Sequence, residues 1–268
     1  MEIEAAGRTR TYTLVEPEDG HDRLLLVFHG SRQNAAKHRT FTGGAFDTIP
    51  GTAVAYLDGY RGNWNDARTA SRFPARLAGV DDVAFAEAVV KQHADGREVY
   101  AAGYSNGGGM VIRLLHEHPD LIAGATVIAA QQPAPANFLV PGLPVVPKPV
   151  LLLHGTADRI VPYEGGEMSA WARFAFRVGG EMLSTPDTAA YFAQRNGITA
   201  PPVTVELSEE ISRTDYRQDG HAPVRLYTVR GGGHTIPGPH PAPRLVGRTS
   251  HDLHTTAAMA EFLWISTG

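Results

Sequence analysis

Six short stretches of the chain are apolar without interruption, and most of them end at glycine. Apolar runs that do not alternate with polar residues are typical of strands covered on both faces, as in a parallel sheet. Residues 3–17 instead alternate around Gly7, which predicts a β-hairpin near the start of the chain. The six apolar runs are 23–30, 52–59, 98–104, 123–130, 148–155 and 223–233.

Helical patterns lie between these runs. Apolar side chains recur at helical spacing in 80–94 and 109–120, and 184–197 has a Ser/Thr cap, a proline in its first turn and a closing glycine. A last helix is expected at 250–266. Strands that alternate with helices predict an α/β fold, with a mostly parallel, doubly wound sheet and helices on both faces. Functional groups of such sheets gather at the carboxyl ends of the strands.

The length of the chain, 268 residues, favours a single domain over 1–268, because α/β folds of this size are commonly undivided. Two segments are candidates for a cap or lid. The segment 133–149 is rich in proline, and 166–183 carries aromatic residues at near-helical spacing. Both follow predicted strands, where such excursions are commonly inserted. The sequence leaves open whether they form a connector, part of the core or a lid.

The composition of the chain limits which classes of binding partner are expected. The net charge is −4 and no cluster of Lys or Arg occurs, so no nucleic-acid partner is expected. The chain contains no cysteine, and no apolar run approaches the length of a membrane span. Residues 1–20 lack the pattern of a signal peptide. The sequence as it stands predicts a cytoplasmic protein, or a secreted one if a leader has been removed, and leaves the oligomeric state open.

The strongest chemical motif is Gly103-Tyr104-Ser105-Asn106-Gly107, which follows a predicted strand and opens a predicted helix. This is the G-x-S-x-G pattern of a nucleophile elbow, in which a strained turn exposes the serine hydroxyl. The flanking glycines allow the strand and the helix to pass very close to each other. A glycine-rich turn can also hold a phosphate, but the usual phosphate-loop patterns are absent. Ser105 is therefore the candidate nucleophile.

A serine hydroxyl needs a base at neutral pH, and the elbow enzymes supply Asp or Glu and then His from later strands. Asp158 and His234 follow the strands predicted at 148–155 and 223–233, in the required order. We expect His234 to take the serine proton and Asp158 to orient the imidazole. The alternatives are that Asp158 is a turn residue and His234 a histidine of a glycine-rich turn. The rival bases are His221, His240, His251 and His254.

The remaining candidates lie on loops after other strands. The backbone N–H groups of Ser31 and Asn106 are expected to form the oxyanion hole. Trp64 is a candidate contact for an acyl or aromatic group, and Tyr104 flanks the nucleophile at the cleft. Each aromatic residue has a structural alternative, namely packing against the scaffold. His251 and His254 are spaced three apart, but no third metal ligand is evident, so no metal site is predicted.

Together the motifs resemble the polyhydroxybutyrate depolymerase-like and feruloyl esterase-like carboxylesterases of the α/β-hydrolase fold. The resemblance runs from about Leu24 to the last helix, and its most specific parts are 154–163 and 231–235. It implies ester hydrolysis through an acyl-enzyme with Ser105, Asp158 and His234 as the triad. It also implies that the reaction uses no metal or organic cofactor. The motifs that carry the resemblance are 29–35, 58–68, 80–90, 103–110, 154–166 and 231–238.

One position departs from the family pattern. The last motif often carries tryptophan after His-Thr, where this chain has Ile236. The resemblance places that side chain beside the catalytic histidine, so Ile236 is a further candidate for substrate binding. The missing tryptophan weakens any transfer of substrate from the family.

The sequence therefore favours a serine carboxylesterase acting on a small or polymeric ester. Hydroxycinnamoyl, acetyl, short aliphatic and polyester substrates are all open. A peptidase or amidase with the same triad is one alternative. The other is a binding protein of the same fold that has lost its chemistry, which the presence of Ser105, Asp158 and His234 argues against.

Overall fold

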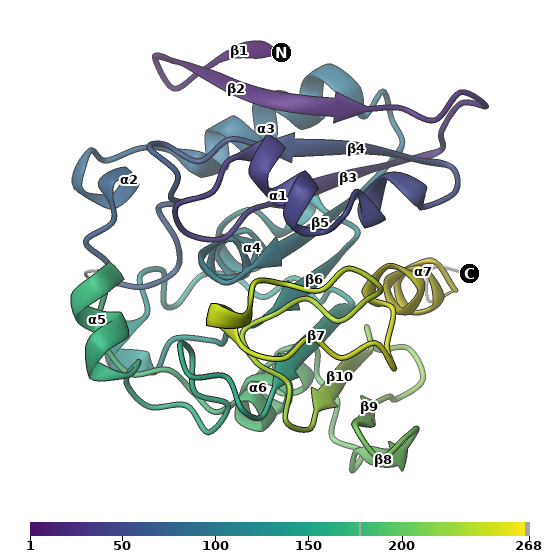
Figure 1. Ribbon diagram of the computed structural model, residues 1–268. Helices are drawn as coiled ribbons and strands as arrows, with labels where there is room; N and C mark the ends of the chain where they lie inside the picture. The colour runs from purple at the N-terminus through teal and green to yellow at the C-terminus, as the bar shows by residue number, and fades with distance from the viewer. Residues whose placement is uncertain (177, 266–268) are drawn as a thin grey trace.

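A ten-stranded sheet forms the centre of the molecule in the computed structural model, which describes residues 1–176 and 178–265. The order of the strands across the sheet is β1-β2-β4-β3-β5-β6-β7-β10-β9-β8. Figure 1 shows the N-terminal hairpin at one edge and β8 and β9 at the other. The strands are β1 (Glu2–Ala5), β2 (Arg8–Val15), β3 (Arg23–Phe28), β4 (Thr52–Leu57), β5 (Glu98–Tyr104), β6 (Gly124–Ile128), β7 (Val150–Gly155), β8 (Val203–Glu206), β9 (Ile211–Tyr216) and β10 (Val224–Val229).

The central strands are parallel and the edges are antiparallel. β4, β3, β5, β6, β7 and β10 pair in parallel, and each corresponds to one of the six apolar runs. The hairpin β1–β2 adds to one side and β9–β8 to the other, both antiparallel. The prediction of a mostly parallel sheet is therefore confirmed.

Helices cover both faces of the sheet, as predicted. Because successive side chains of a strand point to opposite faces, Leu24 and Leu26 of β3 belong to one core cluster, while Leu25 and Val27 belong to the other. The α-helices are α1 (Ala35–Phe41), α2 (Pro74–Leu77), α3 (Asp82–His93), α4 (Asn106–Glu117), α5 (Ala170–Phe176), α6 (Thr185–Arg195) and α7 (Thr255–Ile265). The 3₁₀ turns are η1 (Ala45–Thr48), η2 (Pro119–Leu121), η3 (Pro135–Asn137) and η4 (Arg244–Val246).

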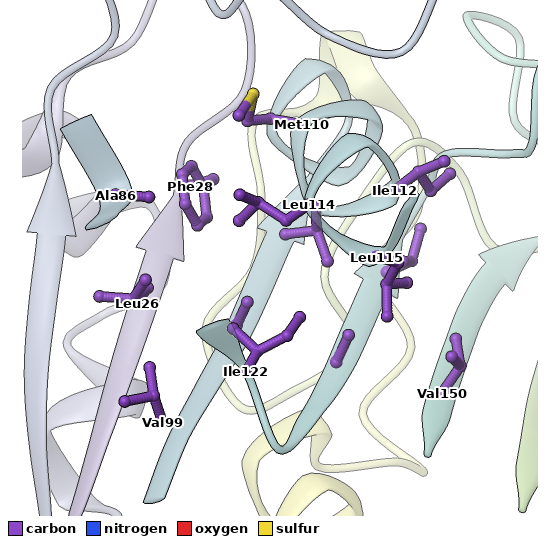
Figure 2. Packing of buried hydrophobic residues seen from close by; sticks show 14 of the residues in the cluster. Leu26, Phe28, Ala86, Val99, Met110, Ile112, Leu114, Leu115, Ile122 and Val150 are labelled. Atoms are coloured by element: carbon purple, nitrogen blue, oxygen red, sulfur yellow. The ribbon is translucent and has the colours of Figure 1, made fainter. Parts of the chain in front are cut away.

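The larger cluster lies between the sheet and helices α3, α4 and α6. Figure 2 shows Met110 and Leu114 of α4 beside Phe28 of β3. All three side chains are fully buried. The smaller cluster packs α1 and α7 against the opposite face. Among the described residues, no helix combines the length and the apolar character that crossing a membrane requires.

The structure differs from the sequence expectation in two places. Strands β8 and β9 carry no unbroken apolar run, and all four residues of β8 are exposed, so the apolar pattern gave no signal for them. The last helix begins at Thr255, five residues later than expected. His251 therefore precedes the helix, and its Nδ1 lies 2.7 Å from the carbonyl oxygen of Gly238. Ser266, in the expected helix, lies outside the described residues.

The two candidate lid segments meet each other. Pro133 and Gly166 both form isolated β-bridges with Met182. Val178 bridges to Ser71, on the loop that follows β4. A small apolar cluster joins this region to the loop after β7, and it consists of Phe73, Ile160, Val161, Met168, Ala172 and Val178. The segment 166–183 and the start of 133–149 thus lie over the carboxyl-terminal edge of the sheet. Phe138 packs against the larger cluster, and the end of 133–149 leads to the amino end of β7.

The junction of β5 and α4 is extremely tight. A Cβ atom on Gly103 would lie 2.2 Å from the carbonyl oxygen of Gly107, and one on Gly107 would lie 2.1 Å from the carbonyl oxygen of Phe28. Both contacts are to backbone atoms, which cannot move aside cheaply. Ser105, between these glycines, has φ 56° and ψ −119°. The chain turns from strand to helix within one residue, and that residue is the candidate nucleophile.

We predict that Gly107→Ala destabilises the protein by at least about 2 kcal/mol, because the new methyl group overlaps backbone atoms of β3. Urea unfolding at pH 7 measures the change. Gly179→Ala is the matched control, since a Cβ there meets no atom within 4 Å, and its effect stays within about 1 kcal/mol. Equal unfolding midpoints for Gly107→Ala and wild type would contradict the close approach.

Candidate active site

Ser105, His234 and Asp158 form one hydrogen-bonded chain. Ser105 Oγ lies 2.8 Å from Nε2 of His234, and Nδ1 of His234 lies 2.6 Å from Oδ2 of Asp158. The three residues come from the loops after β5, β10 and β7. Because these strands are parallel neighbours or near neighbours, their carboxyl ends meet at one edge of the sheet. This geometry can transfer a proton from serine to histidine while the carboxylate stabilises the imidazolium.

The carboxylate of Asp158 is held from both sides. Its Oδ1 accepts hydrogen bonds from the backbone N–H groups of Ile160 and Val161, at 2.8 and 2.9 Å. Burial by itself raises the pKa of Asp158, but the charge of His234 and the hydrogen bonds from His154 and His234 outweigh it and hold the pKa well below its usual range. Asp158 is thus an ionised, fixed acceptor beside the histidine.

His154 is a second histidine on this carboxylate, and the sequence reasoning assigned it no role. Its Nε2 lies 3.2 Å from Oδ2 of Asp158 and 3.0 Å from the carbonyl oxygen of Val161. Its Nδ1 lies 2.9 Å from the hydroxyl of Thr185, which accepts a hydrogen bond from the amide of Gln131. Since that hydroxyl can give its proton to Nδ1, Nε2 is the donor toward Asp158. The sequence feature that could have indicated this role of His154 is a histidine next to glycine at the end of a predicted strand.

The loop after β3 is fixed by His29. Nε2 of His29 accepts the backbone N–H of Gly59 at 2.9 Å, so its proton is on Nδ1, which donates to the carbonyl oxygen of Gly30 at 2.7 Å. Burial lowers the pKa of His29 to about 4, so the ring is neutral at pH 7. In a trans peptide the C=O and the next N–H point in opposite directions. The N–H of Ser31 therefore points away from the His29 ring.

Gln33 and His38 support the same loop. The Oε1 atom of Gln33 accepts the N–H of Gly30 at 3.1 Å, which identifies it as the oxygen of the amide, and it lies 3.0 Å from Nδ1 of His38. Burial lowers the pKa of His38 to about 3. Two neutral, buried histidines thus hold the backbone from which Ser31 projects. The sequence pattern indicated Ser31 as an oxyanion donor, but it did not indicate that Gln33 and His38 support its loop.

The second predicted oxyanion donor is Asn106, the first residue of α4, whose N–H has no acceptor within the helix. Its side chain is fixed: Oδ1 accepts the N–H of Trp64 at 2.8 Å, and Nδ2 donates to Asp66 at 2.6 Å. Asp66 is fully buried. The loop after β4 is thereby tied to the nucleophile elbow.

The prediction for Trp64 needs correction. Its side chain is fully buried, its indole N–H donates to the carbonyl oxygen of His29 at 2.8 Å, and its ring packs on Phe28 and His29. Because the indole lies behind the loop after β3, it does not line the cavity beside Ser105. Trp64 therefore packs against the scaffold, which was the structural alternative to contacting an acyl or aromatic group.

A cavity of about 280 Å³ opens beside Ser105. Its wall is mainly apolar and includes residues of the segment 166–183. Tyr104 lines it as expected, and the Tyr104 hydroxyl donates to the carbonyl oxygen of His234 at 2.6 Å. Residues of the wall include Ser31, Phe73, Ile160, Met168, Val178 and Met182.

Ile236 also needs correction. It lies two residues beyond the candidate base, but it lines a separate, small hollow together with Phe41 and His240 rather than the cavity beside Ser105. The chain turns away from the cavity between His234 and Ile236, so that side chain packs against the α1–η1 region.

The rival histidines are engaged elsewhere. Nδ1 of His221 lies 2.8 Å from the carbonyl oxygen of Asn196, and His221 precedes β10 instead of following it. His240 packs on Gly43, and His251 is bonded to Gly238. His254 does not line the cavity beside Ser105. Among the described histidines, His234 is the one placed within hydrogen-bond distance of Ser105.

No protein-family model matches the chain. It is 34% identical to the protein named Putative esterase NocK, of Nocardia uniformis subsp. tsuyamanensis, over 98% of this chain and 81% of that protein. It is also 29% identical to feruloyl esterase B of Piromyces equi, over 79% of this chain and 39% of that longer protein.

Solved structures agree on the fold. The acetyl xylan esterase from Aspergillus awamori superposes with a TM-score of 0.58 at 14% identity, over 94% of this chain and 93% of that one. Est1E from Butyrivibrio proteoclasticus gives 0.55 at 15% identity, over 100% and 98%. The sheet order, the elbow and the position of the three residues define an α/β-hydrolase. Within this class, the chain belongs to the esterase family that includes NocK.

We predict that the protein loses stability as the pH falls from about 6.5 to about 4. His29 and His38 bind a proton near pH 6.5 when unfolded, but only near 4 and 3 when folded. The unfolded state therefore binds more protons in this window, and the free energy of unfolding rises with pH there. Each histidine contributes up to about 1.4 kcal/mol per pH unit.

Urea unfolding of wild type and His38→Gln between pH 7 and pH 5 measures this dependence. The variant keeps an amide donor toward Gln33 but cannot titrate, so its pH slope is weaker by about one proton. Identical slopes would show that His38 binds its proton equally well in the folded and unfolded states, and would overturn the assignment.

Proposed function

We propose that this protein is a serine carboxylesterase in which Ser105 forms an acyl-enzyme. The observation that carries the proposal is the continuous hydrogen-bonded chain from Ser105 through His234 to Asp158, at the edge of an apolar cavity. Membership of an esterase family supports the same reaction. Residues 1–268 act as one catalytic domain.

In the first step, Ser105 Oγ attacks the ester carbonyl carbon while His234 Nε2 takes the serine proton. The negative charge that develops on the carbonyl oxygen is accepted by the N–H groups of Ser31 and Asn106. The carbon–oxygen bond to the alcohol then breaks, and His234 gives its proton to the departing oxygen. Asp158 stabilises the imidazolium between these two transfers. Water releases the acid by the same steps, with His234 again as the base.

The cavity favours a small acyl group with an apolar part. Tyr104 lies at its wall, and Pro133 and the segment 166–183 contribute a cover in the manner of a lid. The sequence relatives include a feruloyl esterase, and the structures of similar fold include an acetyl xylan esterase. Hydroxycinnamoyl, acetyl and short aliphatic esters, or the ends of a polyester, are the substrates to compare. A matched anilide tests whether amides are attacked as well.

We predict that wild type hydrolyses 4-nitrophenyl esters, measured from acetate to decanoate and with ferulate. Ser105→Ala lowers kcat at least about a thousandfold, because the nucleophile is removed. His234→Gln has an effect of similar size, because the base is removed. His221→Gln is the matched control, since His221 lies before β10 and is engaged with Asn196.

The ester with the highest kcat/KM reports the length that the cavity accommodates. Folding of each variant is checked by circular dichroism. Equal hydrolysis by wild type and folded Ser105→Ala, or none by either on every ester, would contradict the proposal.

A further inference from the structure

One cationic side chain forms part of the wall of the cavity beside Ser105. Arg68 lies on the loop after β4 and is 8% exposed. The cavity wall around it is apolar, with Phe73 and Met168 as its immediate neighbours. A guanidinium in such surroundings is costly unless its charge and its donors are satisfied. The contacts of Arg68 therefore indicate what the cavity is suited to bind.

The strong hydrogen bonds of the Arg68 side chain are all made to one carboxylate, that of Asp66. Nε and Nη2 donate to the carboxylate of Asp66, at 3.2 and 2.5 Å from its Oδ2. The remaining terminal nitrogen, Nη1, has one hydrogen-bond partner among the described residues, the thioether sulfur of Met168 at 3.7 Å. A thioether is a weak acceptor. Nη1 is thus a nearly unused donor at the cavity wall, and its position is set by the pairing with Asp66.

The charge around Arg68 is also incomplete. Arg76 donates to the backbone carbonyl oxygens of Asp66 and Arg68, and Arg113 pairs with Glu117. The guanidinium groups of Arg68, Arg76 and Arg113 thus face the carboxylates of Asp66 and Glu117, while the nearby carboxylate of Asp82 is paired with Arg10. Asp66 already accepts from Asn106 as well as from Arg68. One further anion would balance this group.

We infer that Arg68 is a specificity-determining residue that binds a carboxylate at the far end of the acyl group. The inference rests on the proposed esterase function and names the substrate class, half-esters of dicarboxylic acids. The acyl group lies along the apolar wall, and its terminal carboxylate accepts hydrogen bonds from Nη1 and the free edge of Nη2. Arg–carboxylate contacts of this kind are strong when partly buried. Because Asp66 joins Arg68 to Asn106, the anchor is rigidly connected to the oxyanion helix.

The experiment compares three 4-nitrophenyl esters of similar length on wild type: the adipate half-ester, its neutral carboxamide analogue and the hexanoate. Spontaneous hydrolysis is measured with Ser105→Ala and subtracted. We expect kcat/KM for the adipate half-ester to exceed that for each neutral ester at least tenfold. Equal values for the carboxamide and the carboxylate, or a preference for hexanoate, would overturn the inference. If no ester is hydrolysed, the proposed function itself fails, which is a different result.

Variants then assign the preference to Arg68. In Arg68→Gln the ratio of kcat/KM values, adipate half-ester over hexanoate, falls to within twofold of one. Arg68→Lys keeps a cation without the planar fork and retains part of the ratio. Arg72→Gln, an exposed arginine of the same loop, is the matched control and keeps the full ratio.

A ratio is used because Arg68→Gln leaves Asp66 without its partner and alters the elbow for all substrates alike. If Arg68→Gln does not fold, the wild-type series and Arg68→Lys still decide the question. An unchanged ratio in folded Arg68→Gln would limit the residue to holding Asp66 and overturn the inference.

Discussion

The structure depends on the approach of strand β5 to helix α4 at Gly103 and Gly107. At both positions the room for a Cβ atom is taken by backbone carbonyl groups. Only a chain without side chains at these points can turn from strand to helix so sharply. The turn leaves Ser105 in a conformation that costs about 1–3 kcal/mol for a residue with a side chain. That cost is offset by the packing of α4 against the sheet, where nearly the whole helix is buried. As a result of this turn, Ser105 Oγ lies at the sheet edge within hydrogen-bond distance of His234.

Around this turn, buried histidines set the positions of backbone and side-chain groups. His29 holds the carbonyl of Gly30, His38 holds the side chain that fixes the N–H of Gly30, and His154 donates to the carboxylate of Asp158. His29 and His38 are buried, and their lowered pKa values keep them uncharged. A neutral imidazole offers one donor and one acceptor in fixed directions, which suits the orientation of a peptide. The candidate base, His234, differs because Nε2 of its ring faces the Ser105 hydroxyl at the edge of the cavity.

Much of this was predictable from the sequence, because the central elements and the positions of the three candidate residues follow from local patterns. Unbroken apolar runs identified the parallel strands, and glycine spacing identified the elbow. The edge strands β8 and β9 gave no such signal, since β8 is exposed along its whole length and β9 consists mainly of polar residues. Trp64 and Ile236 were misplaced because a loop residue's direction depends on what packs behind it. Trp64 fills the space under the loop after β3, and Ile236 follows the chain away from the cavity. The roles of Asp66, His38 and His154 depend on individual side-chain contacts, to Asn106, Gln33 and Asp158, which periodicity does not reveal.

The central claim is that the elbow presents Ser105 as a nucleophile activated by His234. The most direct measurement is reaction with a diethyl phosphate ester inhibitor, followed by intact-mass and peptide-mapping mass spectrometry. The chain has nine serines. The account predicts one adduct per chain, located on Ser105, and formed much more slowly in His234→Gln. An adduct on another serine, or none on the folded wild-type protein, would contradict it.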